Sequence, residues 1–317
     1  MFNPSTANAF GPDDYPIISW VFLIAGLCGI VLNVFVIYNL YKRPVFHCAF
    51  GRICLSHSIA ALGNNATYAL VVAPITFIDA EYQLTYWGKR SGVLVICFWL
   101  AGIFCHVFMS INRFVCMYFH FRYAQIFSDF VTKAGIFLIW LIAILISTLQ
   151  FLPDCECFVW IDNFNYEWYI NECGLILGLY GDFALSVAGI CLVALLDFLT
   201  YLKVRKYNSL QHRNSVGSTN DASSKSNIRF FYQSAAQGLA AVLEIITYFY
   251  VSPTFNNKWM RFFCSAFLFL AVNLVDAVIV TMFNKEIRNV IWKTKAIPSV
   301  MPQQTVSDIQ GTVDGQS

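Results

Sequence analysis

Ionisable side chains that interrupt long apolar stretches are the residues of this chain that could do chemistry. Arg113 follows an apolar run in the segment MSINRFVCMYFHFRY. Asp182, Glu244 and Asp276 each lie within another apolar run. A charged group in the middle of a membrane costs at least about 2.5 to 3.5 kcal/mol, so each of these groups is expected to have a partner or a function. The chemistry that they indicate is ion pairing, ligand binding and conformational switching.

Motifs for catalysis and for cofactor binding are absent from the sequence. It contains no Gly-x-Ser-x-Gly or His-Glu-x-x-His segment and no paired-aspartate signature of an intramembrane enzyme. His106 would need second and third ligands to hold a metal, and the sequence places neither. The net charge of +2 is too small to favour nucleic acid. We therefore expect no enzymatic activity, no cofactor, no bound metal and no nucleic-acid partner.

The composition indicates a protein of the lipid bilayer. The 317 residues are 58% hydrophobic and 12% charged, which is more apolar surface than a soluble fold of this size could bury. A membrane-spanning helix needs about 20 apolar residues, and seven such runs occur. They predict an all-α membrane protein, a seven-transmembrane helix bundle, with spans near residues 17–41, 49–74, 91–119, 133–152, 173–202, 230–251 and 259–283.

Basic residues determine the expected direction of these spans. Sixteen of the 20 lysines and arginines fall on the side that carries the C-terminal tail, and cytoplasmic loops are the ones enriched in these residues. We therefore expect a multi-pass plasma-membrane protein with its N-terminus extracellular and its C-terminus cytoplasmic. The expected parts are an extracellular N-terminus (1–16), a transmembrane domain (17–283), a short amphipathic eighth helix beside the membrane (284–297) and a disordered cytoplasmic tail (298–317).

Several segments resemble those of rhodopsin-like G-protein-coupled receptors in order and spacing. NRFVCMYFHFRY resembles the Asp-Arg-Tyr segment that ends the third helix, with Asn112 in place of the acid and Tyr123 ten residues after Arg113. DAVIVTMFNKEIR resembles the Asn-Pro-x-x-Tyr segment of the seventh helix, with Asp276 in place of the asparagine. Asn33 resembles the first-helix asparagine. The resemblance implies the receptor fold and its activation machinery.

The sequence is more specifically similar to nematode serpentine chemoreceptors of class X. FGRICLSHSI, SINRFVCMYFHFRYAQIFS, the cysteine-rich acidic second outer loop and FNKEIR carry this resemblance, which covers residues 17 to about 295. It implies a chemosensory receptor that binds a small extracellular ligand and activates a heterotrimeric G protein. A secondary transporter is the alternative, although the two halves of the chain are unlike and transporters commonly consist of repeated halves.

The resemblance places G-protein coupling and activation at the inner end of the third span, where Asn112, Arg113 and Tyr123 lie. Arg113 needs an anion in the resting state, and the sixth span lacks the glutamate that many such receptors provide. The available carboxylates are Asp197, near the inner end of the fifth span, and Asp129, before the fourth. We expect Asp197 to be the partner. In the other interpretation, Arg113 is only an anchor at the membrane interface.

Two groups of polar residues are expected inside the bundle. Asp276 belongs either to a switching cluster or to a protonated, hydrogen-bonded core, and the residues of this intramembrane polar cluster are Asn33, His57, Asn273 and Asp276. Asp182 and Glu244 lie at similar depths in adjacent spans, where they could hold a cationic ligand or be neutral. The candidate ligand pocket is apolar and aromatic, which suits a small hydrophobic ligand, and it consists of Phe98, Trp99, Asp182, Glu244 and Tyr248.

Three cysteines in the second outer loop, PDCECFVWIDNFNYEWYINEC, are candidates for a disulfide, because thiols outside the cell pair. The resemblance would connect this loop to the top of the third span, but Gly88 stands at the matching position. We expect a closure within the loop instead, from Cys155 or Cys157 to Cys173. Such a closure leaves one loop cysteine free or paired with Cys97.

Overall fold

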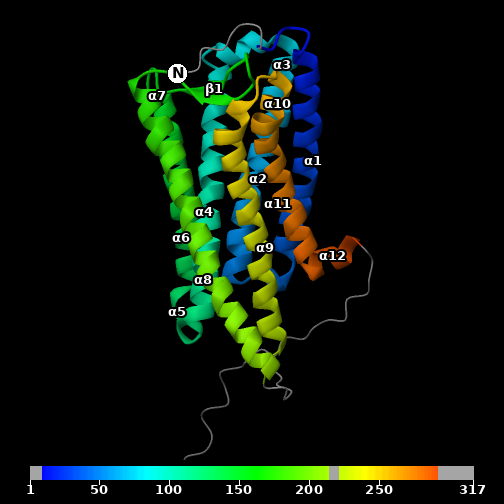
Figure 1. The fold of residues 1–317 in the computed structure, drawn as a ribbon, viewed down its shortest axis with the longest axis vertical. Helices are drawn as coiled ribbons and strands as arrows, with labels where there is room; N and C mark the ends of the chain where they lie inside the picture. The colour runs from blue at the N-terminus through cyan, green and yellow to red at the C-terminus, as the bar shows by residue number, and fades with distance from the viewer. Residues whose placement is uncertain (1–8, 214–220, 292–317) are drawn as a thin grey trace, which may run out of the picture.

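Seven helical rods run side by side along the long axis of the molecule (Figure 1). The computed structural model describes residues 9–213 and 221–291, and within them all side chains except those of 207–231 and 291. Each rod is long and apolar enough to cross a bilayer, and the rods cover Tyr15–Lys42, Ala49–Leu84, Gly88–Tyr118, Asp129–Phe151, Glu172–Lys206, Tyr232–Thr254 and Lys258–Phe283. The prediction of a seven-transmembrane helix bundle is confirmed.

Several rods contain more than one helical segment. The uninterrupted α-helices are α1 (Tyr15–Lys42), α4 (Ser91–Tyr118) and α6 (Asp129–Thr148). The other rods contain α2 (Ala49–Thr67) with α3 (Ala73–Asp79), α7 (Glu172–Ile176) with α8 (Leu185–Arg213), α9 (Asp221–Ile246), and α10 (Lys258–Phe262) with α11 (Leu268–Phe283). Two short helices, α5 (Tyr123–Ile126) and α12 (Lys285–Ile291), follow the third and seventh rods.

Four rods change from α to π geometry towards the end of the bundle that carries the N-terminus. The π segments are η3 (Tyr68–Val72), η8 (Leu177–Ala184), η9 (Thr247–Val251) and η11 (Phe263–Phe267). The sequence predicted that the second span ends near Pro74, yet the helix continues through α3. Pro74 lies directly after η3, where the Ala73 N–H bonds to the Tyr68 carbonyl five residues back, so the missing N–H of Pro74 falls where the regular α hydrogen-bond pattern is already interrupted.

Helix α4 occupies the centre of the bundle. It packs against α2, α6, α8 and α9, and its fully buried side chains include Leu100, Cys105 and Met109. The outward faces of α6 and α8 carry exposed large apolar side chains, such as Phe137 and Phe198. A rod that is apolar on all sides is expected where one face meets its neighbours and the other meets lipid.

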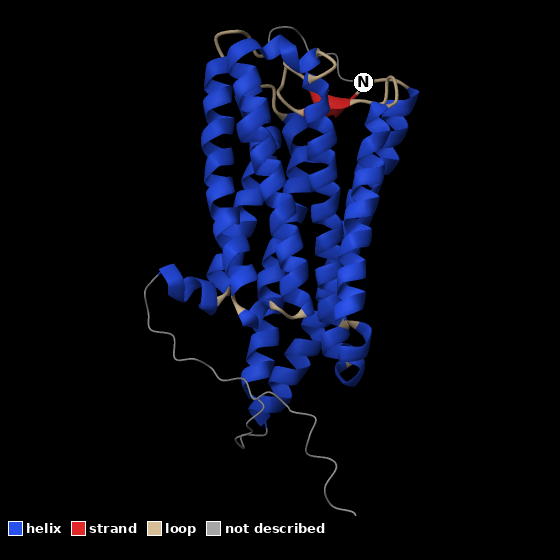
Figure 2. Cartoon of the chain, turned by 180° about the vertical axis from the view of Figure 1, so that it is seen from behind, coloured by secondary structure: helices blue, strands red, loops and turns tan. Residues whose placement is uncertain are grey.

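A two-stranded hairpin covers the end of the bundle that carries the N-terminus (Figure 2). Strands β1 (Cys157–Val159) and β2 (Tyr166–Trp168) pair antiparallel, with Val159 opposite Tyr166. Phe164, in the connecting turn, has a φ of 55° and is fully buried. Its ring packs edge-on against Phe10, and this contact holds the turn on the bundle despite a backbone conformation that bulky residues rarely adopt.

Helix α12 turns away from α11 at the opposite end of the bundle (Figure 1). Ile287 is fully buried against the bundle, and Glu286 lies 3.9 Å from Arg43. The predicted amphipathic helix extends over 284–297, but residues 292–297 lie outside the described residues. The predicted tail (298–317) and most of the predicted N-terminal segment (1–8) also lie outside them.

Candidate functional site

A cavity lies beneath the hairpin, and its empty space, open solvent included, is about 510 Å³. Each of the four π segments contributes a wall residue to it, namely Tyr68, Asp182, Tyr248 and Ala266. A π turn inserts an extra residue into an α-helix and is found frequently at functional sites. The four local distortions of the bundle therefore converge on one space, which we name the outer cavity.

The hairpin is hydrogen-bonded to the walls of the outer cavity. The Tyr248 hydroxyl donates to the backbone carbonyl of Tyr166 at 3.0 Å. The Trp168 indole N–H donates to Oδ2 of Asp182 at 3.1 Å. Tyr166 and Cys157 themselves face the cavity. The hairpin thus forms one wall of the cavity, and its second strand, β2, is hydrogen-bonded to the fifth and sixth rods.

Four of the five residues predicted for the ligand pocket line the outer cavity: Trp99, Asp182, Glu244 and Tyr248. Phe98 does not. Its ring packs against Trp140, with ring centroids 6.0 Å apart, and lines a smaller cavity deeper in the bundle. Successive residues on an α-helix point about 100° apart, so Trp99 reaches the outer cavity while Phe98 lies beside it, and a ligand contact for Phe98 stays a prediction.

The outer cavity is acidic. Glu244 is 3% exposed, and its Oε2 has no hydrogen-bond partner among the described residues. Asp182 accepts a hydrogen bond from the neutral indole N–H of Trp168. None of the described residues that line the cavity is lysine, arginine or histidine. The walls are otherwise mainly apolar and aromatic, so the cavity combines a hydrophobic surface with two carboxyl groups that have no cationic partner in the described part of the chain.

A chain of polar side chains continues towards the middle of the bundle. The Asn33 amide donates to the backbone carbonyl of Asn273 at 3.2 Å, and the Asn64 amide donates to the Asn273 side chain at 3.5 Å. Asp276 lies close to two imidazoles instead: its Oδ2 is 3.6 Å from Nε2 of His57 and 4.0 Å from Nε2 of His106. The predicted polar cluster is therefore present as two adjacent groups, and His106 joins it.

Arg113 is buried near the inner end of α4, with 4% of its side chain exposed. Its guanidinium donates to Oγ of Ser110 at 2.8 Å and to Oδ1 of Asp197 on α8 at 2.5 Å. Nε and Nη1 have no hydrogen-bond partner among the described residues. Asp129, the other carboxylate that the sequence offered, instead contacts Arg52. The structure therefore places Arg113 against the carboxylate that the sequence analysis preferred.

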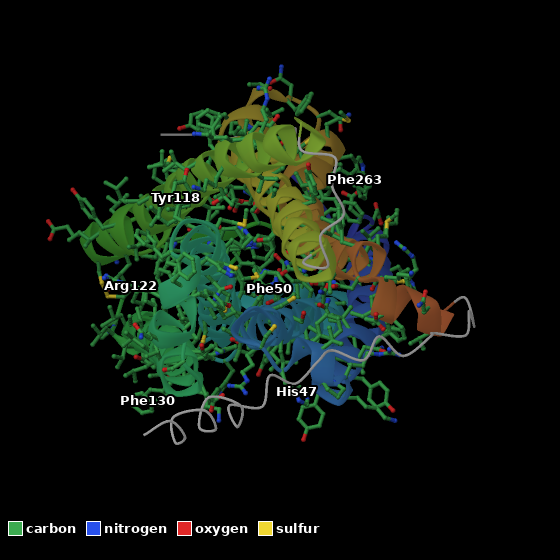
Figure 3. The ribbon with its side chains drawn as sticks, turned by 90° about the horizontal axis from the view of Figure 1, so that it is seen from below. His47, Phe50, Tyr118, Arg122, Phe130 and Phe263 are labelled. Carbon is green, nitrogen blue, oxygen red and sulfur yellow. A yellow bond between two sulfur atoms is a disulfide. The ribbon has the colours of Figure 1, made fainter. Side chains whose placement is uncertain are left out.

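The remaining residues predicted for coupling lie around this pair. The Asn112 amide donates to the Tyr123 hydroxyl at 3.1 Å, which connects α4 to the start of α5. Tyr118 donates to the backbone carbonyl of Leu199 at 3.0 Å and adds a second link between α4 and α8. In the view from below, Arg122 lies near the rim of this face (Figure 3), and its side chain is exposed. The inner end thus combines a buried arginine with an exposed one nearby.

The cysteines of the outer loop divide into a disulfide and a free thiol. Cys155 and Cys173 form a disulfide that closes a sequence separation of 18 residues. Cys157 is a buried free thiol, and Cys97 is also free. Burial raises the pKa of the Cys157 thiol well above its ordinary value, and a thiol that stays protonated is a poor nucleophile. Cys157 therefore acts as a wall residue of the outer cavity.

Sequence reasoning missed the hairpin and the association of His106 with Asp276. The hairpin had a signal: aromatic and β-branched residues flank the turn formers Asp162 and Asn163 in FVWIDNFNYEW. The pairing of His106 had no comparable signal, because it depends on how α4 and α11 are rotated against each other. The π segments left no recognisable mark in the sequence either.

Known proteins are similar to this chain in sequence and in fold. The family model for the serpentine type 7TM GPCR chemoreceptor Srx matches residues 22–284. Serpentine receptor class X 45 of Caenorhabditis elegans is 24% identical over 279 residues, which cover 83% of this chain and 77% of that protein. Serpentine receptor class X-43 of the same organism is 24% identical over 285 residues, which cover 86% and 85%.

The fold is also that of a solved receptor. The crystal structure of squid rhodopsin superimposes with a TM-score of 0.75 over 90% of this chain and 87% of that chain, at 13% sequence identity. At this identity the likeness speaks for the fold alone. The family match extends from the first rod to the end of the seventh, across the outer cavity and the Arg113 site. The chain belongs to the serpentine 7TM GPCR chemoreceptor Srx family.

Proposed function

We propose that the protein binds a small extracellular ligand in the outer cavity and, in response, activates a heterotrimeric G protein at the inner end of the bundle. The observation that carries this proposal is the buried ion pair between Arg113 and Asp197. Arg113 lies on the same helix, α4, as Trp99, which is a wall residue of the outer cavity. Fourteen residues separate the two, or about 21 Å along the helix. One rigid element therefore connects the two sites.

The ion pair accounts for a resting state. Removing a charge from water is costly, and a buried arginine is stable only while its partner remains in place. The contact between Arg113 and Asp197 thus favours the packing in which α4 and α8 lie together. A ligand that binds a different packing better shifts the population towards it. In that packing the pair separates, and the inner end of α4 becomes accessible to the G protein.

The walls of the outer cavity indicate the ligand class. Aromatic residues such as Tyr68, Trp99 and Phe269 give it an apolar surface, which favours a small, mostly hydrophobic molecule. Asp182 and Glu244 supply negative charge where no basic wall residue is described. A small hydrophobic amine matches both properties, because its carbon skeleton would pack on the aromatic rings and its ammonium group would meet the carboxyl groups.

The proposal also includes the orientation in the plasma membrane. The hairpin lies at the end that carries the N-terminus (Figure 2). The disulfide between Cys155 and Cys173 flanks it in sequence, and Cys157 and Tyr166 of its strands line the outer cavity. Disulfides form and persist in oxidising surroundings outside the cytosol, and basic residues concentrate at the opposite end. Both features support an extracellular cavity and a cytoplasmic C-terminus.

Nucleotide exchange on a co-expressed heterotrimeric G protein tests the proposal. Basal exchange and exchange induced by a panel of small hydrophobic amines are measured for the wild type, Arg113→Ala and Arg122→Ala. We expect Arg113→Ala to abolish the induced exchange and Arg122→Ala, which removes an exposed charge, to retain it. Unchanged induced exchange in the Arg113→Ala variant would overturn the mechanism.

A further inference from the structure

His57, His106 and Asp276 bring three metal-ligating side chains together in the centre of the bundle. They come from three different helices, α2, α4 and α11. One ligand atom from each lies within 4.8 Å of the others, and the side chains are only 5%, 7% and 6% exposed. Residues far apart in the sequence thus present two imidazole nitrogens and a carboxylate oxygen to one point. We propose that these three residues bind one divalent transition-metal ion of the zinc class.

The spacing of the ligand atoms is close to what such an ion needs. Zinc binds histidine nitrogen at about 2.0 to 2.1 Å and carboxylate oxygen at about 2.0 to 2.2 Å, in a tetrahedral arrangement. Two tetrahedral ligand atoms at those bond lengths lie about 3.4 Å apart. Oδ2 of Asp276 is 3.6 Å from Nε2 of His57 and 4.0 Å from Nε2 of His106. Small side-chain rotations therefore suffice to bring all three atoms to bonding distance.

Hydrogen bonding within the protein does not account for this convergence. The distances between Asp276 and the two imidazoles exceed hydrogen-bond length. Nδ1 of His106 and Oδ1 of Asp276 have no hydrogen-bond partner among the described residues. The Gln237 side chain from α9 lies near Asp276. Its Nε2 has no hydrogen-bond partner among the described residues. Three buried polar groups that face one another without direct bonds are what a shared cation would satisfy.

A second carboxylate nearby balances the charge. Glu244 lines the same small cavity as the three ligands, and its Oε2 is buried without a hydrogen-bond partner among the described residues. A site that contains a divalent ion, two neutral imidazoles and the carboxylates of Asp276 and Glu244 would have no net charge. Charge neutrality matters here, because an uncompensated charge inside a membrane is costly.

The ligand types select the class of ion. Imidazole nitrogens suit zinc, copper and nickel, whereas magnesium and calcium prefer sites made of oxygen ligands. Two of the three ligands here are imidazoles. We therefore expect zinc to bind far more tightly than magnesium or calcium.

The position of the site gives the ion a role in regulation. It would connect the second, third and seventh rods directly, and so favour the packing in which they lie together. Trp99 and Glu244 line both this cavity and the outer cavity, so occupancy of one space changes the walls of the other. This inference rests on the ligand geometry alone and does not depend on G-protein coupling.

Zinc binding to the full-length receptor tests the proposal. The detergent-purified chain is stripped with EDTA and titrated with ZnCl2, while bound zinc is measured by equilibrium dialysis and stability by thermal unfolding. We expect binding that raises the Tm, with no rise in MgCl2 or CaCl2. His106→Asn and Asp276→Asn should each lower zinc affinity at least about tenfold, as even the loss of a supporting contact commonly does. His47→Asn is the matched control, because His47 is exposed at the inner face (Figure 3).

A spectroscopic variant keeps the test decisive if the asparagine variants fail to fold. Co²⁺ in place of zinc should give visible ligand-field absorption in the wild type, without a thiolate charge-transfer band. His106→Cys retains a metal ligand and should add that band. Absence of zinc binding in the wild type, unchanged affinity in folded His106→Asn, equal stabilisation by MgCl2, or no new band in His106→Cys with Co²⁺ bound would each overturn the proposal.

Discussion

The inner and outer ends of the bundle differ in whether their buried ionisable groups have a partner of opposite charge. At the inner end, the guanidinium of Arg113 is paired with the carboxylate of Asp197. In the outer cavity, Asp182 and Glu244 have no basic neighbour among the described wall residues. A satisfied pair stabilises one packing, whereas carboxyl groups without a counter-charge add little to stability and remain available to a ligand. In the mechanism that we propose, the inner end therefore holds the resting state, and ligand binding at the outer end shifts the receptor away from it.

The largest effect should come from breaking the inner pair. Asp197→Ala leaves the Arg113 guanidinium buried without its carboxylate, and loss of one partner of a buried pair costs about 3 to 5 kcal/mol. We expect a lower Tm together with raised basal nucleotide exchange, because the resting packing loses the buried ion pair between α4 and α8.

Asp129→Ala is the control for that change. Asp129 pairs with Arg52 and Lys133 but is about half exposed, and exposed pairs contribute about 0 to 1 kcal/mol. Equal losses of stability in the two variants would show that the buried ion pair contributes no more than the exposed one.

Removal of the disulfide should affect the outer end and leave the inner end intact. Cys155→Ser opens a loop with a sequence separation of 18 residues, and closing a loop of about 15 residues stabilises a fold by about 3 kcal/mol. Hydrogen exchange should accelerate in the hairpin and in α7 but not around Arg113. Cys191→Ser, at an exposed free cysteine, should change neither region. Faster exchange around Arg113 would show that the two ends are not independent.

In the outer cavity, we expect a substitution that raises stability rather than lowers it. Glu244 is buried with an oxygen that lacks a partner, so Glu244→Gln removes a poorly compensated carboxyl group and should raise stability by about 1 kcal/mol in EDTA. The same change should weaken the response to hydrophobic amines, because it removes part of their counter-charge. A loss of stability as large as that of Asp197→Ala would refute the comparison between the two ends.

The smallest effect concerns an ion pair at the outer rim. Lys258 lies 2.5 Å from Asp14. Burial raises the pKa of Asp14, but the Gly11 backbone N–H and Lys258 together outweigh burial and lower it below 3.8. A lowered carboxyl pKa stabilises the fold above the unfolded value, and that contribution is lost as the pH falls through the folded value.

Lys258→Ala should therefore reduce stability by less than about 1 kcal/mol near neutral pH. It should also flatten the decline of Tm at pH values below 3.8. Lys133→Ala, at an exposed position, should leave the dependence of Tm on acidic pH unchanged. The same dependence in wild type and Lys258→Ala would show that Lys258 does not lower the pKa of Asp14.

The sequence predicted the rods because apolar length is a local property, and it favoured Asp197 as the partner of Arg113 because both lie near inner ends of spans. Contacts that depend on helix rotation could not be predicted in this way. Phe98 and Trp99 are adjacent in the chain, yet only Trp99 faces the outer cavity. His106 meets His57 and Asp276 only because three helices present particular faces. The π segments add to this difficulty, since each one shifts the residues beyond it.

The π segments also bear on how a receptor repertoire can diversify. Each π turn takes up an extra residue, so deleting one residue from η3, η9 or η11 would restore α geometry within that turn while the flanking parts of the rod kept their facing. The set of side chains that borders the outer cavity would then change, and the geometry around Arg113 would not. Insertions and deletions of single residues in these segments are therefore a route to differently lined cavities on an unchanged inner end.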